Sequence, residues 1–181
     1  MKKFVCVLVA VCSSMALALE TEAEYLVPNG QLSQDYGVWS ASYPSLDKDN
    51  FQSQVINDKD SIWVVAYVKP TCRSCTRLAE QYKDLTSRPS ITSRKVKFGF
   101  VDISKDVAND VVSKYSNGHD VTYTPTVLVY GADKSKPTAY SGDYSANDLD
   151  KHICGVCDKQ GFSPAGAIQP KAVTSSGGST T

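Results

Sequence analysis

The stretch VVAYVKPTCRSCTRLAEQY, from Val64 to Tyr82, joins an apolar run to two cysteines and then to a helical pattern. Thiol–disulfide exchange needs a thiolate that a substrate can reach and a second thiol that resolves the mixed disulfide. Two cysteines separated by two residues, at the junction of a strand and a helix, meet both needs. We therefore predict that Cys72 and Cys75 are a catalytic redox pair.

The residues around the pair favour a thiolate on Cys72. The start of a helix presents unpaired backbone N–H groups and the positive end of the helix dipole. Thr71 is the expected N-cap, and Arg73 and Arg77 add positive charge nearby. We expect Arg73, directly after the first cysteine, to lower the pKa of Cys72.

Two other uses of the pair stay open on these residues. A zinc site needs four ligands, but Cys154 and Cys157 lie almost eighty residues further along the chain, beyond the usual spacing of a zinc ribbon. A permanent structural disulfide within such a pair closes only a small loop and adds little stability. Redox chemistry is the stronger interpretation, and we expect no metal.

Residues 1–19 are expected to be a secretory signal peptide. A positively charged start precedes an apolar run from Phe4 to Leu19, and the small residues Ala16 and Ala18 offer a cleavage site. A signal anchor is the alternative, but the run is shorter than the ~20 residues that span a bilayer. Cleavage leaves two C-x-x-C pairs in an oxidising compartment.

The rest of the chain divides into three parts. We expect an extended leader at 20–37, one domain at 38–160, and a disordered tail at 161–181 that is rich in Gly, Ser and Thr and lacks a KDEL-type signal. Nineteen basic residues balance nineteen acidic ones, so no overall field favours nucleic acid or an anionic membrane. We expect neither partner once the signal is cleaved.

Within the domain, hydrophobic periodicity predicts alternating helices and strands. The apolar run from Ile62 to Val68 does not alternate, which is typical of a strand buried on both faces. Helices are expected at 46–56, 75–85, 107–115 and 145–153, and strands at 62–68, 96–103, 126–130 and 138–141. This order predicts an α/β domain with a mixed sheet of four or five strands and helices on both faces.

The segment AYVKPTCRSCTRLAEQY, followed about fifty residues later by YTPTVLVY, resembles a thioredoxin-fold domain of the protein disulfide isomerase type over roughly residues 40–155. The resemblance implies a thioredoxin-like fold in which Cys72 attacks and the buried Cys75 resolves. It also implies a cis peptide bond before Pro125 that faces the dithiol. The backbone of Thr124 would then pair with an extended substrate segment.

The chain departs from the family pattern at the site. Ala66 stands where the family usually has a buried acid that shuttles protons to the resolving thiol, and Thr71 replaces an aromatic residue. Arg73 and Ser74 replace the usual Gly-His or Gly-Pro pair. His119, in the loop before the predicted cis-proline, is expected to be either a solvated side chain or a proton relay.

A second pair closes the domain in HICGVCD, residues 152–158. Gly155 favours the end of the last helix there, and the negative end of the dipole disfavours a thiolate. We therefore expect a structural disulfide between Cys154 and Cys157. The alternatives are a secondary redox pair that exchanges electrons with the first, and a metal or intermolecular link.

The sequence as a whole predicts a thiol–disulfide oxidoreductase that acts on protein cysteines in the secretory pathway, in the endoplasmic reticulum lumen or secreted. Its partners would be cysteine-containing client proteins and an unidentified redox partner, without a cofactor. The alternative is a substrate-binding or chaperone module with little redox turnover, which the departures at Ala66 and Thr71 motivate.

Overall fold

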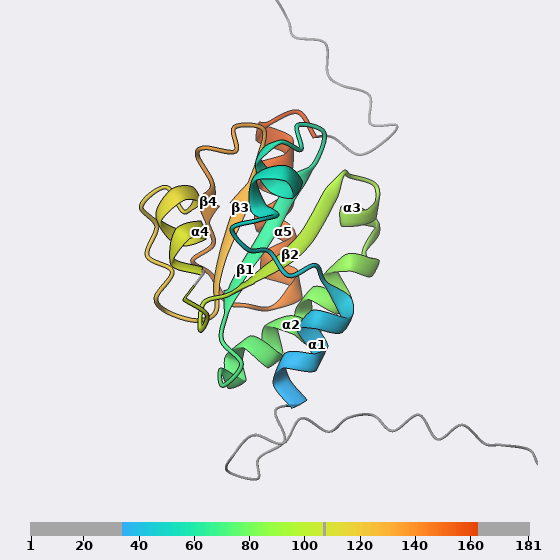
Figure 1. Cartoon of the computed structure of the whole chain (residues 1–181). Coiled ribbons are helices and arrows are strands. Elements are labelled where there is room, and N and C mark those ends of the chain that lie inside the picture. Colours follow the sequence, from blue (N-terminus) through green and yellow to red (C-terminus); the bar gives the residue numbers. More distant parts are fainter. Residues whose placement is uncertain (1–33, 107, 163–181) are drawn as a thin grey trace, which may run out of the picture. The chain divides into compact units, whose positions relative to one another are not determined.

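The computed structural model describes residues 34–106 and 108–162. They contain a four-stranded sheet in the order β2-β1-β3-β4 (Figure 1). Its strands are β1 (Ile62–Val68), β2 (Val96–Asp102), β3 (Thr126–Tyr130) and β4 (Thr138–Ala139). β1 runs parallel to β2 and antiparallel to β3, and β3 runs antiparallel to β4. The predicted mixed sheet is confirmed, and β1 and β3 have the predicted bounds.

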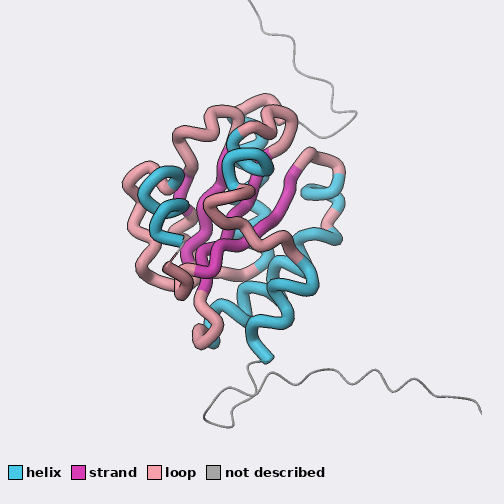
Figure 2. Tube along the Cα trace, in the orientation of Figure 1, coloured by secondary structure: helices cyan, strands magenta, loops and turns pink. Residues whose placement is uncertain are grey.

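Helices cover both faces of this sheet, as Figure 2 shows. Every residue of β1 is buried, and alternate side chains point to opposite faces. The helices are α1 (Gln34–Ser42), the π-helical turn η1 (Gln52–Ile56), α2 (Arg73–Ser87), α3 (Pro89–Thr92), α4 (Ala108–Tyr115) and α5 (Ala146–Lys159). Ala66 and its neighbours two residues away join a core cluster with α1, α2, α3 and α5, whereas Trp63, Val65 and Tyr67 join a second cluster with η1 and α4.

Helix α1 begins inside the stretch that was expected to be an extended leader. Its amphipathic pattern is weak, but Trp39 is almost completely buried against the rings of Tyr43, Tyr82 and Phe100. Burial of one large aromatic side chain stabilises the docked helix. A tertiary contact of this kind has no local signature in the sequence.

The predicted helix at 46–56 forms only in its second half. The backbone N–H of Leu46 donates to the carbonyl of Phe100, which aligns this segment with β2. The carboxylate of Asp47 then accepts from the backbone N–H groups of Asp49 and Asn50, a turn typical of aspartate. Helical structure starts after this turn.

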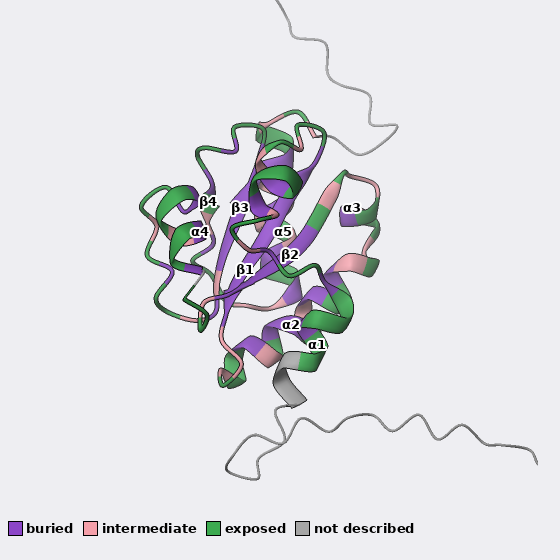
Figure 3. Cartoon of the chain, viewed as in Figure 1, coloured by how far each residue is buried: buried purple, intermediate pink, exposed green. Residues whose placement is uncertain are grey.

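Helix α5 continues past Gly155, where its end was expected. Ile153, Val156 and Cys157 are buried against the core, as the purple segments of Figure 3 indicate for this helix. This burial outweighs the cost of about 1 kcal/mol for a glycine within a helix. The helix ends instead before Gly161, whose φ is 79°, and the N–H of Phe162 donates to the carbonyl of Cys157.

The predicted signal peptide, most of the leader and nearly all of the tail lie outside the described residues. Within residues 34–106 and 108–162, each helix is too short or too polar to cross a bilayer.

Candidate active site

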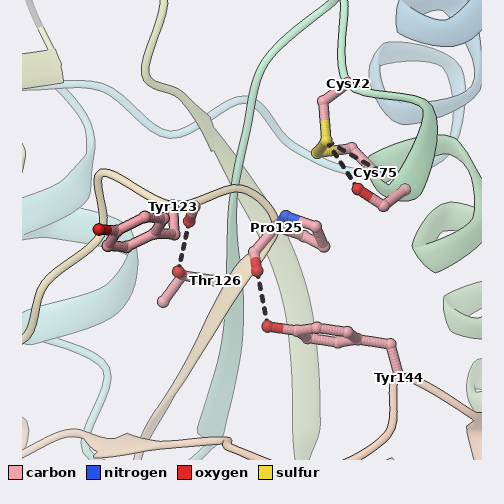
Figure 4. Close-up of a disulfide and its surroundings, with 7 residues drawn as sticks. Cys72, Cys75, Tyr123, Pro125, Thr126 and Tyr144 are labelled. Atoms are coloured by element: carbon pink, nitrogen blue, oxygen red, sulfur yellow. Dashed lines mark hydrogen bonds between the residues drawn. A yellow bond between two sulfur atoms is a disulfide. The ribbon is translucent and has the colours of Figure 1, made fainter.

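Cys72 and Cys75 form a disulfide at the start of α2 (Figure 4). Cys72 is the N-cap residue of the helix, in place of the predicted Thr71, because its Sγ accepts from the backbone N–H of Cys75 at 3.1 Å. The hydroxyl of Ser74 lies 3.3 Å from the same sulfur. Cys72 is partly exposed, whereas Cys75 is 1% exposed. A thiol in solution can therefore approach the first sulfur and not the second.

The peptide bond between Thr124 and Pro125 is cis, as the resemblance implies, and Pro125 lies beside the disulfide in Figure 4. The hydroxyl of Thr126 donates to the carbonyl of Tyr123 at 2.6 Å, and the hydroxyl of Tyr144 donates to the carbonyl of Pro125 at 2.6 Å. Within the described residues, the backbone N–H and carbonyl of Thr124 have no hydrogen-bond partner. They remain available to an extended peptide.

Tyr144 and Ser74 were not among the residues predicted for the site. Ser74 lies between the two cysteines, so its position in the sequence could have indicated a contact with Cys72. Tyr144 precedes the N-cap of the last helix by one residue and lies nineteen residues from Pro125. Only the folded chain brings it to the site.

The core beneath the dithiol is apolar at the point where the family usually has an acid. Ala66 is completely buried, and its register partners are Phe100 on β2 and Val127 on β3, both completely buried as well. Cys75 belongs to the same core cluster. None of these strand positions carries a group that could accept the proton of Cys75.

The other two polar groups singled out near the site differ in their contacts. Arg73 is exposed and forms no ion pair among the described residues, so its charge is not neutralised by a neighbouring carboxylate. His119 is half-buried, and its Nε2 is hydrogen-bonded to the carbonyl of Pro137 at 2.9 Å. This contact ties the loop to the segment before β4.

The disulfide predicted between Cys154 and Cys157 is wrong, because both are free cysteines in the structure. α5 is continuous here, and each side chain has its own neighbours. The thiol of Cys154 donates to Oδ1 of Asp150 at 3.2 Å, whereas Cys157 is completely buried in the core. Burial and the carboxylate of Asp150 raise the pKa of Cys154 to about 11, and burial raises the pKa of Cys157.

The second pair also lies far from the first. The sulfur of Cys154 is 3.9 Å from the carbonyl of Ser90, which follows the C-terminal end of α2, whereas Cys72 caps its N-terminal end. A helix of 15 residues is about 22 Å long. Direct exchange between the two pairs would need sulfurs in contact, so the folded domain does not support it. The described residues also contain no group of three or more His, Cys, Asp or Glu placed to hold a metal ion.

We expect Cys154 and Cys157 to resist alkylation in the folded protein. A thiol whose pKa lies near 11 carries very little thiolate at pH 8, so iodoacetamide should react about a hundredfold more slowly than in denaturant. Peptide mass spectrometry after timed alkylation, with and without guanidinium, measures this directly. Rapid labelling of the native protein at either residue would contradict the buried, high-pKa environment.

Comparisons with known proteins agree with this geometry. The family model described as thioredoxin matches residues 42–155. The chain is 32% identical over 114 residues to the protein disulfide-isomerase A6 homolog of Caenorhabditis elegans, a match that covers 63% of this chain and 24% of the relative. It is 34% identical over 105 residues to protein disulfide isomerase-like 2-3 of Oryza sativa subsp. japonica, covering 58% of this chain and 22% of the relative. The chain thus spans about a quarter of these relatives.

Two of the solved structures that share the fold illustrate the similarity. The first thioredoxin domain of mouse protein disulfide-isomerase A4 has a TM-score of 0.50 and 21% identity, and the match covers 72% of this chain and 82% of that one. The J-Trx1 fragment of ERdj5 has a TM-score of 0.52 and 18% identity, with 67% of this chain and 55% of that one covered.

Proposed function

The chain belongs to the thioredoxin family, as a thioredoxin-fold protein of the protein disulfide isomerase type, and we propose that it is a thiol–disulfide oxidoreductase acting on protein cysteines. The observation that carries the proposal is the disulfide between a partly exposed Cys72, which caps α2, and a buried Cys75. This asymmetry supports a division into an attacking and a resolving cysteine.

In the oxidising direction, a client thiolate attacks Sγ of Cys72, the Cys72–Cys75 bond breaks, and Cys75 leaves as a thiolate that takes up a proton. A second client thiolate then attacks the client sulfur of the mixed disulfide and releases Cys72. The client loses two electrons and two protons, and the protein becomes a dithiol. In the reducing direction, Cys72 attacks a client disulfide and Cys75 attacks Cys72 to release the reduced client.

Thr124 and Pro125 form the client-binding segment in this proposal. The unpaired backbone groups of Thr124 can form β-type hydrogen bonds with an extended client backbone. Such pairing is independent of the client side chains, so it suits a protein that acts on many clients. The cysteine of the client would then lie beside the disulfide next to Pro125.

Turnover of model clients tests the proposal. The protein is assayed for reduction of insulin disulfides and for refolding of a scrambled disulfide substrate, each against a blank without protein. We expect acceleration in at least one assay. Its absence in both would favour the alternative of a binding module with little redox turnover. Equilibration of the Cys72–Cys75 couple with glutathione gives the reduction potential, which decides the direction of transfer.

Arg73→Ala should slow the reaction of reduced Cys72 with iodoacetamide at pH 7 by about two- to fivefold, the effect of one exposed charge. The exposed, unpaired guanidinium stabilises the Cys72 thiolate through its positive charge, and Arg73→Lys should retain most of the rate. Timed alkylation of the reduced protein measures the effect. Lys83→Ala, which removes an exposed cation further along α2, is the matched control. Equal rates for wild type and Arg73→Ala would remove Arg73 from this role.

The second candidate is a substrate-binding or chaperone module with little redox turnover. The observation that favours it is the completely buried Ala66 between Phe100 and Val127, which leaves Cys75 without a proton acceptor at this strand position. Binding of an unfolded client without any acceleration of disulfide exchange would support this candidate.

The proposed setting is the secretory pathway, in the endoplasmic reticulum lumen or secreted. The proposal rests on the predicted signal peptide at residues 1–19 and on a disulfide that persists in oxidising compartments. The proposed partners are client proteins with cysteines and a second redox couple that resets the dithiol. N-terminal sequencing of the protein recovered from a eukaryotic secretory host tests the cleavage.

A further inference from the structure

Tyr144 contacts the proposed client-binding segment, Thr124 and Pro125, through a hydrogen bond to its backbone. Its hydroxyl donates to the carbonyl of Pro125 at 2.6 Å, and Figure 4 shows the ring reaching toward that carbonyl below the disulfide. Burial raises the pKa of Tyr144, so the hydroxyl stays protonated and remains a donor at neutral pH. The hydrogen bond is therefore present under the conditions in which a client binds.

The loop that carries Tyr144 is fixed at both ends. The backbone N–H of Tyr140 donates to the carbonyl of Val127 on β3 at 2.9 Å. Ser145, directly after Tyr144, caps α5 by accepting from the backbone N–H of Asp148 at 3.3 Å. The ring of Tyr144 also packs edge-on against Tyr140, with centroids 5.6 Å apart. The hydroxyl is thus held in place before any client arrives.

Thr124 and Pro125, the segment that Tyr144 contacts, form few other hydrogen bonds. Thr126 fixes the carbonyl of Tyr123, but Thr124 itself has no hydrogen bond within the described residues. The carbonyl of Pro125 is the next group along the chain, so the hydroxyl of Tyr144 limits the positions that Thr124 can adopt. Ordering a backbone before binding lowers the entropy lost when a ligand pairs with it.

We propose that Tyr144 is a positioning residue, whose hydroxyl holds Pro125, and through it Thr124, in the conformation that pairs with an extended client backbone. This inference rests on the proposed function. Tyr144 touches neither sulfur in this role, so it acts on client affinity and leaves the chemistry of the dithiol unchanged.

Tyr144→Phe tests the proposal, because it removes the hydroxyl and keeps the ring that packs on Tyr140. With a disulfide-containing peptide as client, we expect KM to rise about three- to tenfold, the effect of one lost hydrogen bond, while kcat changes less than twofold. Dithiothreitol has no backbone to pair with Thr124, so its rate of reduction of the Cys72–Cys75 disulfide should also change less than twofold.

Tyr115→Phe is the matched control. The hydroxyl of Tyr115 donates to Oε1 of Gln52 at 3.0 Å in the core cluster on the opposite face of the sheet. This variant should leave KM unchanged, and thermal melting of both variants verifies that they are folded.

Three results would overturn the inference. An unchanged KM in Tyr144→Phe would remove the positioning role while the proposed function stands. An equal fall of the peptide and dithiothreitol rates would assign Tyr144 to the dithiol instead of the client segment. If the wild type reacts with dithiothreitol but turns over no peptide or protein client, the proposed function fails, and the inference falls with it.

Discussion

We expect Cys72→Ser to reduce the turnover of insulin disulfides to the rate of the assay without protein. Serine cannot form the mixed disulfide, and the buried Cys75 cannot replace Cys72 because client sulfurs do not reach it. The loss of a covalent nucleophile is among the largest effects that one substitution has on catalysis. Insulin reduction and refolding of a scrambled substrate, with wild type and variant at equal concentration, measure it. Turnover by the variant that matches wild type would refute the enzymatic proposal.

The complementary variant is Cys75→Ala, which keeps the attacking thiol and removes the resolving one. It should accumulate mixed disulfides on Cys72 that disappear on reduction. Cys154→Ala is the matched control, since its thiol lies near the far end of α2 and its pKa is about 11. Mixed disulfides that depended on Cys154 would reverse the assignment of the two pairs.

Ala66→Asp should lower the free energy of unfolding by about 3–5 kcal/mol at pH 8, the cost of a buried charge without a partner. Ala66 is completely buried between Phe100 and Val127. Burial raises the pKa of the new carboxyl in the folded state above the unfolded value of about 3.9. The folded state then binds more protons than the unfolded state, so stability falls as pH rises from about 4 to the folded pKa.

Ala66→Asn is the matched control, because the amide has the same shape and does not ionise. Its cost should be the same at pH 4.5 and pH 8, whereas the cost of Ala66→Asp should grow between these values. Urea unfolding at both pH values measures the difference. A pH-independent cost for both variants would mean that water or a polar group reaches this position and could accept the proton of Cys75.

The sequence was a reliable guide where local chemistry determines the structure. β1 and β3 were predicted to the residue because their apolar runs are bounded by turns, and the pairing of Cys72 with Cys75 was predicted because two cysteines at this spacing can form a disulfide. α1 was missed because the burial of Trp39 against rings that are distant in the sequence has no local pattern. The end of α5 was misplaced because burial outweighed the propensity of Gly155.

At the site, too, features with a local sequence pattern were predicted and those that depend on tertiary contacts were not. The disulfide and the cis peptide bond follow from the motifs, and Ala66 could be located by counting back from Cys72. The N-cap was assigned to Thr71 on side-chain preference, but the sulfur of Cys72 takes that position. The contact from Tyr144 depends on where the fold places the loop between β4 and α5, which no local pattern encodes.

Cys72 and Cys75 lie at the start of α2, and Cys154 lies near its other end. Cys154 and Cys157 can therefore serve as an internal standard when the oxidation state of the first pair is measured. In the described residues, Cys72 and Cys75 form a disulfide, whereas Cys154 and Cys157 are free cysteines. In the proposed function, only the first pair would gain or lose two electrons. After denaturation, these four residues supply two free thiols in the oxidised protein and four in the reduced protein. The labelling of Cys154 and Cys157 therefore calibrates each sample, and the fraction oxidised can be measured in a cell extract without purifying the protein.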